Sequence, residues 1–182
     1  MRLSFSLFLF VCCFGAASAV AQTAATKSPV NLTGTWALDL KASDFGGNKT
    51  YLIYDSLTLV ISHNDPVLNI TRQIAKKKST RTQELIYYTD ARGETNVNLN
   101  EHGKVESKTS WRDKVVSTNG TESTPMGGDV IMGDVSDRWE LSDDGNTLIE
   151  YTSSSPLRSK FGKINFASLG AQKVKKVFRR QP

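Results

Sequence analysis

Two charged residues occupy positions where the sequence pattern places apolar side chains, and they have the clearest potential for chemistry. Arg72 alternates in phase with Leu68 and Ile70. Asp137 alternates in phase with Trp139. Because an unpaired buried charge costs several kcal/mol, each needs a partner. We expect both side chains to face an interior that holds the polar head of a ligand. The alternatives are a structural ion pair and a strand register that turns Arg72 to water.

Aromatic and hydroxyl side chains are expected around the same space. Small-ligand pockets combine aromatic walls with a few convergent polar groups and occupy about 300–1,000 Å³. The sequence therefore predicts a lumen that binds a small hydrophobic or amphipathic molecule. The expected ligand-binding residues are Arg72, Tyr88, Thr109, Trp111, Asp137 and Trp139.

Other kinds of site have little support in the sequence. His63 and His102 lie in expected turns without the spacing of metal ligands, and residues 143–146 form a turn without the glutamate of a calcium loop. No nucleophile elbow or ordered triad is recognisable. A glycosidase pair would need two inward acids, for which only Asp137 and Glu84 qualify. We expect no metal and no cofactor, and the absence of a catalytic motif argues against an enzyme.

The N-terminus has the layout of a secretory signal peptide. A positive start at Arg2 precedes an apolar run from Leu3 to Phe14 and a small-residue stretch that ends at Ala21. Cleavage after Ala21, or after Ala19, would give a secreted or periplasmic protein. Both cysteines lie in the removed segment, so the mature core would hold without disulfides. No later segment has the about 20 apolar residues of a transmembrane helix.

The rest of the chain reads as a disordered leader over residues 22–30 and one β domain over residues 31–182. Its first strand carries Trp36, Leu38 and Leu40 on one face. About ten short strands separated by turns favour an all-β, antiparallel up-and-down meander that closes into a barrel of about 8–10 strands. The expected strands are Leu32–Leu40, Tyr51–Ser62, Val67–Ile74, Thr80–Thr89, Glu94–Asn100, Val105–Arg112, Val115–Glu122, Val135–Ser142, Thr147–Ser153 and Val174–Arg180.

The start Gly34-Thr35-Trp36, in a signal-bearing chain of successive hairpins, resembles the lipocalins and the wider calycin group of barrels. The resemblance implies a calycin-type barrel over most of the mature chain. It also implies that Trp36 plugs the closed end, with an arginine from a late strand packed on it. The matching arginine would be Arg179 or Arg180.

Three functions remain open at this stage. The first is an exported barrel that binds a small ligand in its lumen. The second is a protein-interaction or inhibitor module that uses the loops Ser123–Gly133 and Ser154–Gly170 or the basic C-terminal end. The third is an enzyme that uses the same lumen. Residues 157–182 carry eight basic residues, and all 18 acidic residues precede them. Such an end could meet an anionic partner or guard an edge strand against pairing, and we expect no nucleic-acid partner.

Overall fold

The computed structural model describes residues 30–46, 55–98, 101–162 and 171–182. The expected signal peptide and nearly all of the expected leader lie outside the described residues, as does the start of the strand expected from Tyr51. No helix that could span a membrane occurs in the described ranges. All the regular structure there is antiparallel β, which confirms the predicted fold class.

In the described ranges, eleven strands form one sheet with a meander topology. Each strand from β1 to β4, and each from β5 to β9, pairs with its neighbours in sequence, and β11 lies between β1 and β9. The order is β4-β3-β2-β1-β11-β9-β8-β7-β6-β5, and the short β10 pairs with β8. The strands are β1 (Gly34–Leu38), β2 (Ser56–Asn64), β3 (Val67–Lys76), β4 (Ser79–Tyr88), β5 (Glu94–Val97), β6 (Lys104–Arg112), β7 (Val115–Met126), β8 (Asp129–Leu141), β9 (Thr147–Ser154), β10 (Arg158–Ser159) and β11 (Gln172–Arg180).

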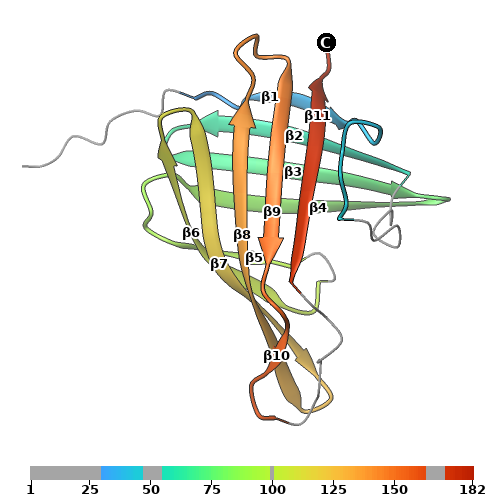
Figure 1. Ribbon diagram of the computed structural model, residues 1–182, viewed down its shortest axis with the longest axis vertical. Coiled ribbons are helices and arrows are strands. Elements are labelled where there is room, and N and C mark those ends of the chain that lie inside the picture. Colours follow the sequence, from blue (N-terminus) through green and yellow to red (C-terminus); the bar gives the residue numbers. More distant parts are fainter. Residues whose placement is uncertain (1–29, 47–54, 99–100, 163–170) are drawn as a thin grey trace, which may run out of the picture.

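The sheet wraps into two layers that cross at a steep angle. In Figure 1 the strands β2, β3 and β4 run across the molecule, while β8, β9 and β11 run nearly upright in front of them. Strand β1 joins the layers because it pairs with both β2 and β11. The two layers enclose the interior from opposite sides, and the β7–β8 hairpin extends beyond them as an arm.

Trp36 lies at the centre of the apolar core. The residue is fully buried, and its indole Nε1 donates a hydrogen bond of 3.0 Å to the carbonyl of Leu32. Leu57, Leu59 and Ile61 alternate along β2, and all three belong to the same buried cluster. Alternation along strands of two layers thus assembles one contiguous core around the first strand.

The first strand is shorter than predicted. It ends at Leu38, and Leu40 is 39% exposed, so the expected inward position of Leu40 is wrong. The carboxylate of Asp39 accepts hydrogen bonds from the backbone amides of Lys41 and Ala42 at 3.2 Å. This local turn competes with the strand and ends it.

Arg180 covers the closed end of the barrel. Its guanidinium lies 4.3 Å from the centroid of the Trp36 ring, whereas Arg179 points outward and bonds Asp39 at 3.2 Å. Gly34 has a φ of 148°, and a Cβ there would lie 2.8 Å from Arg180 Nη1. Glycine is therefore needed at position 34 for two reasons. It adopts the positive φ without steric cost, and its lack of a Cβ leaves room for the guanidinium of Arg180.

The loop predicted over Ser123–Gly133 is wrong. Strand β7 continues to Met126 and β8 begins at Asp129, with Gly127 and Gly128 forming a tight turn at φ values of 56° and 77°. Two consecutive residues with positive φ match the twist of a hairpin, and glycine adopts them without steric cost. The segment is an extended arm rather than a flexible binding loop.

The barrel is nearly closed, and side chains complete it at the seam between the end strands β4 and β5. The side-chain amide of Asn96 accepts a hydrogen bond from the backbone N–H of Ile86 at 2.8 Å and donates one to its carbonyl at 2.9 Å. Glu94 accepts a bond of 3.3 Å from the N–H of Tyr88. These contacts satisfy the backbone of β4 where no strand ladder reaches it.

Candidate functional site

A polar lumen lies beside the apolar core, between the two layers of strands. Its cavity has a volume of about 170 Å³ and is lined by residues of β3 to β9 and of β11. Three carboxylates (Glu122, Asp137 and Glu150) and two cations (Arg72 and Lys176) face it. The cavity is smaller than the range expected from the sequence for a ligand pocket.

Glu150 is the centre of the charged cluster. Its side chain is only 1% exposed, and its two oxygens receive Arg72 Nη2 at 2.9 Å and Lys176 Nζ at 2.8 Å. Burial alone would raise the pKa of Glu150, but the positive charges of Lys176 and Arg72 outweigh that effect and lower it. Both lumen cations are therefore engaged by one ionised carboxylate.

Asp137 has a different environment in the same lumen. Its Oδ1 accepts a hydrogen bond of 2.6 Å from Thr152, the residue that faces it on β9. Burial raises the pKa of Asp137, and the nearby negative charge of Glu150 raises it further. Asp137 is thus the lumen carboxylate for which a positive or proton-donating partner would be most favourable.

Gln83 presents a second acceptor to the lumen. Its Nε2 donates a bond of 2.9 Å to the carbonyl of Val97 across the seam, which fixes the orientation of the amide. In the described part of the chain its Oε1 is buried and has no hydrogen-bond partner. Such an atom costs about 1–3 kcal/mol when it stays unsatisfied.

Tyr87, from the same strand as Gln83, also lines the cavity, and burial raises the pKa of its phenol.

Comparison with known proteins identifies the fold. No protein-family model matches the chain, and no curated protein matches it by sequence. Among solved structures, a point mutant of the REP1-NXSQ fatty acid transporter matches with a TM-score of 0.50 and 12% identity, over 82% of this chain and 98% of that one. This likeness, together with the meander, shows the architecture. The fold is a calycin-type barrel.

Two fatty-acid-binding proteins also resemble this calycin-type barrel. The Echinococcus granulosus fatty-acid-binding protein 1 matches with a TM-score of 0.47 and 12% identity, over 82% of this chain and 97% of that one. The protein from Drosophila melanogaster brain matches with a TM-score of 0.47 and 14% identity, over 82% and 99%. The expected all-β, antiparallel barrel is confirmed by the strand order and by the likeness to the transporter structure.

The structure brings only some of the predicted site residues to the lumen of the calycin-type barrel. Arg72 and Asp137 line it, as their phase predicted. Thr109 is fully buried, and its hydroxyl contacts that of Thr118 at 2.7 Å. The tryptophans Trp111 and Trp139 pack with the apolar core and are not among the residues that line the cavity.

The predicted position of Tyr88 is wrong by one residue. Tyr87 is buried and faces the lumen, whereas Tyr88 faces outward, with the guanidinium of Arg92 at 4.9 Å from its ring centroid. Glu84 is also misplaced: it is exposed and accepts a bond of 2.8 Å from Thr71. Side chains alternate with a period of two, so a one-residue error in phase reverses the face of every residue on the strand.

Sequence reasoning missed Glu150, Lys176 and Gln83. Two of them carried a readable signal, because Glu150 alternates with Leu148, and Lys176 alternates with Phe178, on faces that prove to be buried. The sequence pattern was used to identify inward charged residues only at Arg72 and Asp137, so the same pattern at Glu150 and Lys176 was not used.

Groups of potential metal ligands are the next feature to consider. No group of three or more potential ligands among His, Cys, Asp and Glu occurs there. His63 is buried at the closed end, where burial lowers its pKa more than the charge of Asp65 raises it. Its Nδ1 accepts a hydrogen bond of 3.4 Å from the N–H of Leu32. This histidine therefore anchors the N-terminal segment.

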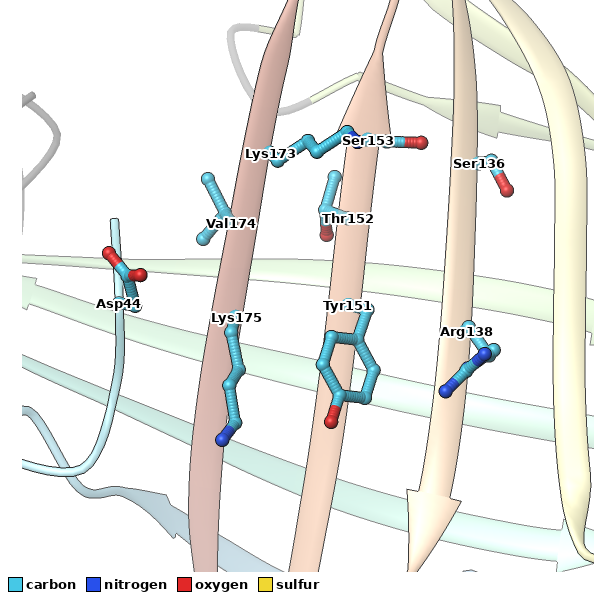
Figure 2. A pocket seen from close by; sticks show the side chains of 9 residues that line it. All are labelled: Asp44, Ser136, Arg138, Tyr151, Thr152, Ser153, Lys173, Val174 and Lys175. Atoms are coloured by element: carbon cyan, nitrogen blue, oxygen red, sulfur yellow. The ribbon is translucent and has the colours of Figure 1, made fainter. Parts of the chain in front are cut away.

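A second hollow lies on the outer face of β8, β9 and β11. It has a volume of about 390 Å³, and Figure 2 shows Arg138, Tyr151 and Lys175 side by side across the three strands. The guanidinium of Arg138 lies 5.0 Å from the Tyr151 ring centroid.

Two basic residues of the C-terminal end make contacts away from this hollow. Lys176 binds Glu150 in the lumen, and Arg180 covers the closed end.

Proposed function

We propose that the protein binds a small amphipathic molecule inside its barrel. The observation that carries the proposal is the cluster of Arg72, Glu150 and Lys176 in the lining of the cavity of about 170 Å³. Buried ionic groups commonly stabilise a fold less than well-packed apolar residues of similar volume would. A charged cluster at a cavity is better explained by recognition of a polar head group, while the adjoining apolar core would receive the rest of the ligand.

The size of the cavity restricts the ligand. A cavity of about 150 Å³ lined by apolar residues holds one benzene molecule. The lumen of about 170 Å³ therefore fits a molecule of about one ring with a short polar arm, unless the walls move apart. A solved structure with a similar fold is described as a mutant of a fatty acid transporter, which supports a ligand site in the lumen.

Native mass spectrometry of the protein expressed with its full sequence tests the proposal. We expect an added mass of a small organic molecule that is released on activation. Arg72→Leu should lower the retained fraction, because it removes a partner of Glu150 and a charge that favours the ionised form of Asp137 in the lumen. Arg138→Leu, on the outer face of β8, is the matched control and should retain the ligand. Unchanged retention and stability in Arg72→Leu would refute the lumen site.

Export is a separate part of the proposal. The first 21 residues have the three-part layout of a signal peptide. Intact-mass analysis of the protein recovered from the periplasm or the medium should give a chain that begins at Gln22. A chain that keeps Met1 in the cytoplasm would refute export and leave the lumen proposal untouched.

A further inference from the structure

We propose that the lumen selects a ligand whose polar head donates hydrogen bonds and is positively charged, in particular an amine, over a carboxylate. This inference rests on the proposed function and narrows it to a chemical class. It follows from which polar groups of the lumen are already satisfied and which are still open.

The cations of the lumen are committed to Glu150. Arg72 Nη2 and Lys176 Nζ bind its two oxygens at 2.9 Å and 2.8 Å, and the carboxylate is almost completely buried. A ligand carboxylate would have to compete with Glu150 for both. Displacing Glu150 would leave that buried carboxylate without its partners, at a cost of several kcal/mol.

Two side chains of the lumen, Gln83 and Asp137, offer acceptors to a ligand, and the phenol of Tyr87 can both donate and accept. The Oε1 of Gln83 is buried without a partner among the described residues, and its orientation is fixed because Nε2 of the same amide bonds Val97. Asp137 lines the cavity and accepts through Oδ1 from Thr152, and an ionised carboxylate can accept further hydrogen bonds. A ligand N–H or O–H would satisfy these atoms, whereas a carboxylate offers only more acceptors.

The balance of charge favours the same ligand. Glu122 and Glu150 offset the two cations of the lumen, and Asp137 adds a third negative charge when it is ionised, a state that burial and Glu150 disfavour by raising its pKa. An ammonium group would stabilise the ionised form of Asp137, and a ligand carboxylate would disfavour it further. In a site of low dielectric constant, the two ligands differ more in their electrostatic interaction energy with the lumen than they would in water. Asp137 is the carboxylate that would gain most, since Glu150 already has two cationic partners.

The experiment compares three probes with the same phenylethyl body and different heads. They are 2-phenylethylamine, 2-phenylethanol and 3-phenylpropanoate, each of about the size that the cavity accepts. Binding to the full mature protein is measured by calorimetry at neutral pH and moderate salt. We expect the amine to bind at least about tenfold more tightly than the carboxylate, with the alcohol between them; tenfold corresponds to about 1.4 kcal/mol.

Variants locate the preference within the lumen. Asp137→Asn keeps an oxygen for Thr152 and should abolish the preference for the amine while the alcohol still binds. Gln83→Met should weaken the amine and the alcohol together. Asp134→Asn, on the outer face of the same strand, should leave all three affinities unchanged.

Three outcomes separate this inference from the proposed function. Tighter binding of the carboxylate, or equal binding of amine and carboxylate, overturns the inference and keeps the lumen as a binding site. Binding of none of the three probes overturns both. An amine preference that survives Asp137→Asn also overturns the inference, because it places the selectivity elsewhere.

Discussion

The guanidinium of Arg180 lies 4.3 Å from the ring centroid of Trp36, although 144 positions separate the two residues in the chain. Two further contacts hold the same side chain, since Nη1 donates to the carbonyl of Thr33 at 3.0 Å and Nε to that of Gly145 at 2.8 Å. Arg180 therefore ties the last strand, the first strand and the β8–β9 turn together over the core tryptophan.

Replacement of Arg180 should weaken the closed end. A cation over an indole contributes about 0.5–2 kcal/mol, depending on its exposure. We expect Arg180→Leu to lower the free energy of unfolding by about 1–2 kcal/mol in urea titrations monitored by tryptophan fluorescence. Arg179→Leu is the matched control, because its side chain lies outside the barrel. A larger loss in the control would show that the ring contact is not what holds this end.

Glu150 should be the most sensitive charged residue of the barrel. Glu150→Gln leaves Arg72 and Lys176 in the lumen with a neutral partner, and the loss of one partner of a buried ion pair typically costs about 3–5 kcal/mol. Glu140→Gln, next to Arg138 on the outer face, should cost less than about 1 kcal/mol. The check is chemical denaturation of both variants under the same conditions.

A triple replacement separates stability from binding at the same site. If Arg72, Glu150 and Lys176 are replaced together by Met, Leu and Met, the buried charges disappear as a set. Stability should then return to within about 1 kcal/mol of the wild type or exceed it. Retention of the small ligand should fall, because Arg72 and Lys176 no longer favour the ionised form of Asp137. A stable triple variant that still binds would mean that the cluster plays no part in recognition.

The sequence predicts most of the fold because the pattern is local. The alternation of Leu57, Leu59 and Ile61 defines an inward face without knowledge of any partner strand. The site depends on long-range closure instead: Arg72 meets Glu150 from 78 positions away, across the lumen. No pattern within a single strand indicates such a pair, so Arg72 could be placed inside the barrel but its partner could not.

His63 should make the protein less stable in mild acid. Burial lowers the pKa of its imidazole below the ordinary value of 6.5, so the unfolded chain takes up a proton that the folded chain resists. Stability is therefore fully present above about pH 6.5 and falls as the pH drops toward the lowered pKa. His63→Gln should flatten this loss between about pH 7.5 and about pH 5.5, while His102→Gln should not. Equal slopes in all three proteins would contradict the assignment.

Asn96 should hold the seam between β4 and β5. Its amide makes two hydrogen bonds to the backbone of Ile86, and Asn96→Leu removes both without opening a large cavity. Each backbone group left unsatisfied costs about 1–3 kcal/mol, unless the seam opens and water replaces the amide. We expect faster hydrogen exchange at the Ile86 amide and faster exchange of a bound ligand. Asn69→Leu, on the outer face of β3 opposite Ile86, is the matched control and should leave both rates unchanged. If Ile86 stays equally protected in Asn96→Leu, the seam is held by packing, and the side-chain bridge has no role in keeping the barrel closed.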